Sequence, residues 1–305
     1  MTPAFETMQR ESAICFPFLG SWTINPPAYI TVFGRNIYLY GILIALGFVL
    51  AITVCARIAP KFGISADSFY DLAIWMIPMT ILGARLYFVV FRWDYYAAHP
   101  AEIFAVWEGG LAIYGGIIAG FLTCWVFCRV KKISFPAMLD VLSFGILIGQ
   151  ILGRWGNFFN REAFGAETDI FCRMGLISPD GSVIYVHPTF LYESLWNLAG
   201  LIFLTLFVKM GKRRYDGHCI LIYFFWYGLG RAWIEGLRTD SLYIGGTGIR
   251  VSQALSLVLV FASGALLLYM RSQPFSPDHL YVNRVAAKEA GMIIEKKEES
   301  SHGGL

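Results

Sequence analysis

Charged residues are scarce in this chain: 15% of its 305 residues are Asp, Glu, Lys or Arg, whereas 57% are hydrophobic. The mean hydropathy is +0.58, which is too apolar for a soluble domain of this size. The composition therefore predicts an integral membrane protein. The net charge of +3 is small, and it gives no indication of nucleic-acid binding.

Cysteine motifs are also missing. The six cysteines form no C-x-x-C pair and have no histidine at metal-ligand spacing, so neither a metal nor a cofactor is expected. Four of them are expected to act as small apolar residues inside the bundle. Cys15 and Cys172 are both predicted to be external, and a disulfide between them stays open.

Long apolar runs dominate the rest of the chain. A window of about 20 residues finds seven candidate transmembrane spans. They lie near residues 38–57, 68–91, 110–129, 136–156, 189–208, 217–237 and 251–270. Because the runs are unbroken and do not alternate, a β-barrel is excluded. The expected fold is an all-α integral membrane protein, a bundle of seven transmembrane helices with a small external head.

The orientation follows from the basic residues. Lysines and arginines gather after the first, third and fifth spans and in the C-terminal tail, and such clusters stay in the cytoplasm. The N-terminus is therefore expected outside and the C-terminus in the cytoplasm. Residues 1–36 are interpreted as an external arm, 37–271 as the seven-span domain with an external segment at 158–188, and 272–305 as a disordered cytoplasmic tail.

Polar residues concentrate at the predicted outer ends of the spans. The stretch GRWGNFFNREAFG, residues 153–165, closes the fourth span, and an arginine there needs a compensating partner or a function. The other spans add residues at the same level: Tyr40, Arg85, Tyr114, His187, Tyr192, Glu193, Tyr227, Arg231, Glu235 and Arg238. This asymmetry predicts a polar cavity at the level of the outer leaflet.

Helical spacing relates several of these residues. Tyr227, Arg231, Glu235 and Arg238 share one face, and Arg154 and Asn157 are three residues apart. Arg231 and Glu235 could form only an i,i+4 ion pair between packed helices. Two arginines from different spans, with few acidic residues in register, favour an anionic ligand, because guanidinium groups bind phosphate with two parallel hydrogen bonds.

The ordered blocks YLYGILIALGF, GARLYFVVFRWDYY, WEGGLAIYGG, GRWGNFFNREAFG, HPTFLYES and YGLGRAWIEGLRTD resemble those of bacterial prolipoprotein diacylglyceryl transferases. The resemblance covers about residues 38 to 242. It implies an enzyme of the bacterial inner membrane that moves the sn-1,2-diacylglyceryl group of phosphatidylglycerol to the lipobox cysteine of a prolipoprotein. The products are a thioether and glycerol 1-phosphate.

The resemblance also implies site residues. The expected catalytic residues are Arg154, Arg231, Tyr114 and Asn157. The expected substrate-binding residues are Tyr40, Arg154, Asn157, Glu162, Gly165, His187, Tyr227, Arg231 and Glu235. His187 is a reserve candidate for proton transfer, although it could simply precede the fifth span as a structural residue.

Tyr114 departs from the family pattern, since many members have H-G-G where this chain has IYGG. A tyrosine, with a pKa of about 10, is a poor general base at neutral pH compared with histidine at about 6.5. We therefore expect Tyr114 to donate a hydrogen bond to the headgroup, and the identity of the base stays open.

Two other classes of protein share some of these features. A transporter or channel could use the same arginines as an anion site, but the odd number of spans and the absence of matching halves argue against it. A lipid-binding subunit without catalysis is the second alternative.

Overall fold

The structure is a computed structural model that describes residues 12–20, 22–239, 243 and 247–302. The first eleven residues of the predicted arm, the last three of the tail and Asp240 of the sixth-span block lie outside these residues. The chain divides into two compact units. The first holds the described residues up to Ala51 with Ser143–Arg213 and His218–Pro274, and the second holds Ile52–Leu142, Arg214–Gly217 and the described residues from Phe275.

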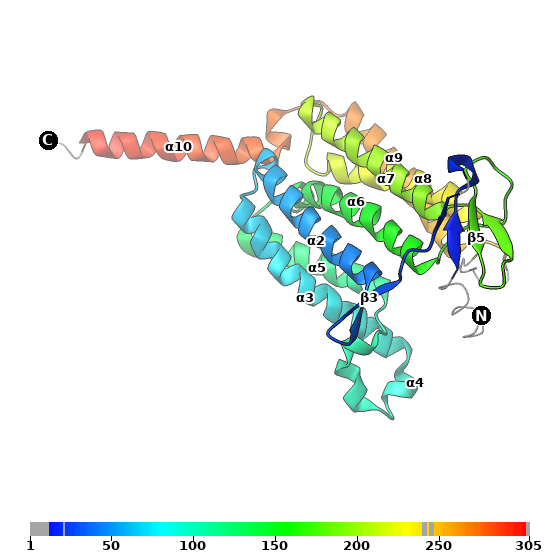
Figure 1. Cartoon of the computed structure of the whole chain (residues 1–305). Helices are drawn as coiled ribbons and strands as arrows, with labels where there is room; N and C mark the ends of the chain where they lie inside the picture. The colour runs from blue at the N-terminus through cyan, green and yellow to red at the C-terminus, as the bar shows by residue number, and fades with distance from the viewer. Residues whose placement is uncertain (1–11, 21, 240–242, 244–246, 303–305) are drawn as a thin grey trace. The chain divides into compact units, whose positions relative to one another are not determined.

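Helices occupy the positions of all seven predicted spans (Figure 1). They are α2 (Leu39–Ile58), α3 (Ala66–Phe91), α5 (Ile113–Lys131), α6 (Phe135–Asn160), α7 (Thr189–Lys209), α8 (His218–Leu237) and α9 (Val251–Ser272). The observed and predicted boundaries differ by at most a few residues. They agree closely because each long apolar run ends at a polar or glycine-containing segment, where the helix also ends.

Among the described residues, six helices are long and apolar enough to cross a membrane: α2, α3, α5, α6, α7 and α9. The exception is α8, a helix of 20 residues that carries Arg231 and Glu235 near its C-terminal end. The prediction of a mostly helical, multi-pass membrane protein is confirmed. The count of seven spans stays a prediction.

In the first unit, an antiparallel sheet joins segments far apart in the sequence. Its strands are β1 (Ala13–Cys15), β2 (Thr23–Ile24), β5 (Met174–Ile177) and β6 (Val183–Val186), in the order β2-β1-β5-β6. Ile14 lies opposite Leu176, and these two form a buried core with Val186 and with Phe190 at the start of α7. The sheet thus links the predicted arm to the predicted external segment, and the external head itself stays a prediction.

A β-hairpin directly precedes α2. Strands β3 (Tyr29–Val32) and β4 (Arg35–Tyr38) pair in antiparallel register. The two turn residues, Phe33 and Gly34, have φ angles of 49° and 75°, as a tight turn between right-twisted strands requires. A short 3-10 helix, η1 (Pro17–Leu19), lies between β1 and β2.

Helices α7 and α8 are held together by two tryptophans in the first unit. The Trp196 indole donates to the Trp226 carbonyl at 2.9 Å, and the Trp226 indole donates to the Trp196 carbonyl at 2.9 Å. The rings stack with centroids 4.8 Å apart. Gly200 lies against Trp226, and Gly230 lies against Trp196, where any Cβ would collide with the indole. This close packing brings the polar residues of α7 and α8 together.

In the second unit, Arg85 of α3 binds backbone carbonyls. Its guanidinium donates to the carbonyls of Glu102, Ile103, Gly109 and Gly110 at 2.6 to 3.1 Å, and the residue is only 6% exposed. Arg85 therefore stabilises the connection between α3 and α5, which contains α4 (Trp93–Tyr96), η3 (Pro100–Phe104) and η4 (Val106–Glu108). Arg85 was predicted to belong to the polar cavity, whereas in the structure it has a structural role.

The C-terminal segment also differs from the prediction. Residues 272–305 were expected to be disordered, but Tyr281–His302 form helix α10, which follows η5 (Pro277–His279). Asp216 accepts the backbone N–H of Tyr281 at 3.0 Å and pairs with Arg284 at 2.8 Å. A carboxylate at the N-terminus of a helix rich in alanine, lysine and glutamate favours helix formation.

Candidate active site

Three helix ends of the first unit supply the polar residues of the site. Arg154 lies in the last two turns of α6, Glu193 near the start of α7, and Arg231 in the last two turns of α8. The C-terminal end of a helix carries partial negative charge and favours a guanidinium group, whereas the N-terminal end favours a carboxylate. The directions of the three helices therefore match the charges at their ends.

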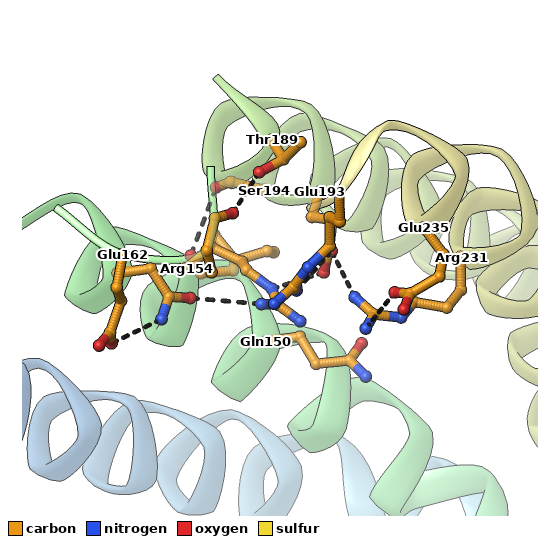
Figure 2. A network of polar contacts seen from close by, with 12 residues as sticks. Gln150, Arg154, Glu162, Thr189, Glu193, Ser194, Arg231 and Glu235 are labelled. Carbon is orange, nitrogen blue, oxygen red and sulfur yellow. Dashed lines mark hydrogen bonds and ion pairs between the residues drawn. The ribbon is translucent and has the colours of Figure 1, made fainter. Parts of the chain in front are cut away.

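Glu193 is the centre of the charged cluster (Figure 2). Its Oε2 lies 2.5 Å from Nε of Arg154, and its Oε1 lies 2.6 Å from a terminal nitrogen of Arg231. A terminal nitrogen of Arg238 is 3.8 Å from the same Oε1. The Glu193 side chain is only 6% exposed, and a buried carboxylate of this kind is stable only when it is paired. It holds both predicted catalytic arginines in one place.

This arrangement corrects one assumption about the arginines. They were expected to have few acidic partners in register, but Glu193 contacts both, and Arg231 also pairs with Glu235 at 2.5 Å. The i,i+4 ion pair considered from the sequence is therefore present. Arg154 and Arg231 share the single carboxylate of Glu193, and each guanidinium group carries several donors, so the pair can also bind an anionic ligand.

Asn157 and Glu162 extend the cluster along α6. A terminal nitrogen of Arg154 donates to Oδ1 of Asn157 at 3.2 Å, and Nδ2 of Asn157 donates to Glu162 at 2.9 Å. Asn160 donates to the same Glu162 oxygen at 3.2 Å. Figure 2 shows this chain of contacts leading from Glu162 to Arg154. Glu162 thus orients Asn157, and Asn157 in turn orients Arg154.

The end of α6 explains how Glu162 reaches this position. Arg161 has a φ of +50°; its N–H donates to the carbonyl of Phe158, and the N–H of Glu162 donates to that of Asn157. This is a Schellman motif, in which the left-handed residue is usually glycine. Arg161 occupies this left-handed position because hydrogen bonds from its side chain hold it in place.

Arg161 anchors the N-terminal segment to the site. Its guanidinium donates to the carbonyls of Ser12, Pro26 and Phe159 and to the side chain of Asn25, at 2.6 to 2.8 Å. The residue is 2% exposed, and burial lowers the pKa of its guanidinium. Contacts between distant segments therefore hold a backbone conformation that an arginine rarely adopts.

The glycines of the signature stretch make close contacts within the protein. At Gly156 a Cβ would collide with the ring of Tyr40 from α2, so this glycine lets the tyrosine lie against α6. Gly165 pairs with Arg238 in a β-bridge, and its N–H donates to the carbonyl of His187 at 2.9 Å. At both glycines the group that approaches the backbone is part of the protein.

His187 lies beside the loop and, among the described residues, forms no ion pair with the cluster. Its Nδ1 is 3.4 Å from the hydroxyl of Tyr192, and partial burial lowers the pKa of its imidazole. The nearby Cys172 is a free thiol, as is Cys15, so the structure contains no bridge between them. Among the described residues, no group of three or more His, Cys, Asp or Glu side chains is arranged to hold a metal ion.

The chain is similar in sequence to known proteins. A family model described as prolipoprotein diacylglyceryl transferase matches residues 27–269. A phosphatidylglycerol–prolipoprotein diacylglyceryl transferase of Finegoldia magna is 44% identical over 249 residues, which cover 81% of this chain and 97% of the relative. A relative of that name from Listeria welshimeri is 43% identical over 261 residues, covering 83% and 93%. The chain belongs to the prolipoprotein diacylglyceryl transferase family.

Tyr114 is the residue expected from the sequence to donate a hydrogen bond to the headgroup. It lies in the first turn of α5, in the second unit, and its side chain is 45% exposed. Its hydroxyl has no hydrogen-bond partner among the described residues. The structure therefore leaves the hydroxyl available to a ligand, and its role in this transferase stays a prediction.

Two residues of the candidate site were not assigned a role from the sequence. Glu193 was noted only as one of several polar residues, and Asn197, one turn further along α7, was not noted at all. Asn197 is 3% exposed and lines a small hollow with Glu193, Tyr227 and Arg231. The available signal was the i,i+4 spacing of two polar residues in an otherwise apolar helix.

Proposed function

We propose that this chain transfers the sn-1,2-diacylglyceryl group of phosphatidylglycerol to the lipobox cysteine of a prolipoprotein. The observation that carries the proposal is the cluster in which the single carboxylate of Glu193 joins Arg154 and Arg231. Family membership supports it, because the relatives are named for this lipid and this acceptor.

In the proposed reaction, the cysteine thiolate attacks C3 of the diacylglyceryl unit. A carbon–sulfur bond forms, the bond between C3 and the phosphate oxygen breaks, and glycerol 1-phosphate leaves with the bonding electrons. Cations lower the pKa of a nearby thiol, so the arginines of the cluster raise the fraction of thiolate. The thiol proton is released to a base that stays unassigned, with His187 as one candidate.

Arg154 and Arg231 bind the phosphate and stabilise the charge that develops on it as it leaves. Preorganised donors of this kind act mainly in the transition state. Before the lipid arrives, Glu193 occupies both guanidinium groups at 2.5 and 2.6 Å and keeps them oriented. Asn157 and Glu162 position Arg154, and Glu235 positions Arg231.

The remaining predicted residues take part in lipid binding. Tyr40 and Tyr227 border the cluster from α2 and α8, Gly165 holds the loop against the end of α8, and Tyr114 donates a hydrogen bond to the headgroup. The enzyme lies in the bacterial inner membrane with its N-terminus outside and its C-terminus in the cytoplasm. This orientation exposes the site to prolipoproteins on the outer side of that membrane.

A transfer assay tests the proposed function. Purified protein is incubated with phosphatidylglycerol labelled in its acyl chains and with a peptide that contains a lipobox cysteine; a serine peptide is the control. We expect label on the cysteine peptide alone, with release of glycerol 1-phosphate. A transporter or a lipid-binding subunit would bind the lipid and leave the peptide unlabelled, and that result would overturn the proposal.

The Arg231→Ala variant separates chemistry from anchoring in the same assay. If Arg231 acts on the leaving phosphate, the rate of the chemical step falls more than the affinity for lipid. Loss of lipid binding with an unchanged single-turnover rate would instead assign Arg231 to headgroup binding alone.

A further inference from the structure

The β-hairpin that precedes α2 is exposed on both of its faces. All residues of β3 (Tyr29–Val32) and of β4 (Arg35–Tyr38) are exposed, and Phe33 in the turn is fully exposed. A two-stranded hairpin is at best marginally stable in water unless one face packs against another surface. The hairpin therefore needs a covering surface that the described part of the chain does not supply.

One face of the hairpin is apolar. Residues directly opposite each other in an antiparallel pair share a face, and successive residues alternate between the faces. The register places Ile30 opposite Ile37. It also places Val32 opposite Arg35 on the same face. This face thus carries three aliphatic side chains and one arginine, and Phe33 adds an apolar side chain at the tip.

The other face is polar and aromatic. The Thr31 hydroxyl donates to Oδ1 of Asn36 at 2.9 Å. The rings of Tyr29 and Tyr38 lie with their centroids 5.7 Å apart. Tyrosine combines an apolar ring with a polar hydroxyl group and is enriched where membranes meet water. The two faces therefore differ in polarity, as they do in an element that lies between lipid and water.

The base of the hairpin is fixed to the start of α2 (Figure 1). The N–H of Leu39, the first residue of the helix, donates to the carbonyl of Ala28 at 2.9 Å. On the preceding side, the Arg161 guanidinium donates to the carbonyl of Pro26 at 2.6 Å. Helix α2 is long and apolar enough to cross a membrane. The hairpin therefore lies at the boundary where a membrane-spanning helix begins.

The length of the hairpin favours one orientation at this boundary. Its four-residue strands are about 14 Å long, whereas each headgroup layer of a bilayer is about 5 to 8 Å thick. An upright hairpin would carry Phe33 into water, and a flat one keeps it in the layer. Because unpaired strand edges do not occur within the hydrocarbon, the backbone stays among the headgroups. Arg35 can reach lipid phosphates from there.

We infer that the hairpin is a lipid-binding element that lies flat on the bilayer, with its apolar face toward the acyl chains and Phe33 inserted at the tip. It anchors the N-terminal segment that Arg161 attaches to α6. A second copy of the chain or an extended peptide could instead pair with an open strand edge. Edge pairing leaves the apolar face in water, so the face favours lipid. The inference does not depend on the proposed transfer reaction.

Photocrosslinking in vesicles tests which surface covers the apolar face. The variant Ile37→p-benzoylphenylalanine carries the probe on that face, and the matched control Asn36→p-benzoylphenylalanine carries it on the other. Each protein is reconstituted in vesicles of phosphatidylcholine and phosphatidylglycerol, irradiated and analysed by mass spectrometry. We expect several-fold more lipid adducts at Ile37 than at Asn36, because neighbouring side chains point to opposite faces. Phe33→p-benzoylphenylalanine should label lipid as strongly as the Ile37 variant.

A second pair of adjacent positions, Thr31 and Val32, decides the question if a probe at Asn36 or Ile37 prevents folding. Equal lipid labelling from both faces, or none from either, would overturn the inference. Adducts of the apolar positions with a second copy of the chain, or with an added lipobox peptide, in place of lipid would also overturn it. None of these measurements requires turnover, so a protein that transfers no lipid would contradict the proposed function and leave this test intact.

Discussion

Arg85 and Arg231 are both largely buried arginines in long helices, but their partners differ in kind. Arg85, in the second unit, donates to four backbone carbonyls. Arg231, in the first unit, pairs with the carboxylates of Glu193 and Glu235. A hydrogen bond from an arginine to a backbone carbonyl stabilises a loop conformation. A side-chain carboxylate, in contrast, can rotate away from its arginine when another anion binds.

The comparison shows which arginines can exchange partners. Arg161 resembles Arg85, because three of its four acceptors are backbone carbonyls. Arg154 resembles Arg231, because both bind Glu193. Burial alone therefore does not indicate function in this protein. The type of acceptor separates arginines that hold the fold from the two arginines that we propose bind phosphate.

The largest effect on activity is expected for Arg154→Lys. Lysine keeps the charge but replaces the planar fork by a single point charge, so we expect at least about a 100-fold loss of kcat/KM in the transfer assay. The variant should still fold, with a melting temperature close to that of wild type. Near-normal transfer would remove Arg154 from the phosphate-binding role and weaken the comparison with Arg85.

The opposite pattern is expected for Arg85→Met. This change leaves four carbonyls without their donor and should lower the free energy of unfolding by about 3 kcal/mol. Thermal unfolding in detergent measures it, and Arg92→Met, at an exposed position of the same segment, is the control. Wild-type stability in the Arg85 variant would contradict a structural role.

Tyr114 lies in the second unit, and two variants test its proposed role as a hydrogen-bond donor. Tyr114→Phe should lose one hydrogen bond to a charged group, about 1.5 to 3 kcal/mol, or roughly tenfold to 100-fold in rate or affinity. Tyr114→His should keep substantial activity, because imidazole can also donate. A pH series of transfer rates checks this: if the Phe variant is inactive while phosphatidylglycerol binds normally, Tyr114 is a base and the donor assignment is wrong.

A smaller effect is expected for Arg161, which combines structural contacts with proximity to the site. Arg161→Gly relieves the positive φ of 50° but deletes all four anchoring hydrogen bonds, and we expect kcat to fall by up to about tenfold with little change in lipid KM. Arg161→Lys should recover part of the rate by restoring some of these bonds. A loss as large as that of Arg154→Lys would place Arg161 in the chemistry itself.

Local signals explain why the helices were predictable. Hydropathy over about 20 residues is a property of each segment alone, and all seven predicted spans correspond to helices, including α8, whose charged end keeps it outside the group of six apolar candidates. The signature arginines were also identifiable, because Arg154 and Arg231 interrupt or end apolar runs where a charge is costly. The sequence by itself therefore determined the helices, the membrane class and the two central arginines.

Contacts between distant segments were decided only by the tertiary structure. The sheet pairs Ile14 with Leu176, and Arg161 binds groups between Ser12 and Pro26, so neither could be read from a local pattern. The role of Glu193 depends on three helix ends meeting, and the burial of Asn197 depends on the packing of α7 against α8. Hydropathy and helical spacing describe one segment at a time, whereas the acceptor that each buried arginine finds depends on which segments fold against it.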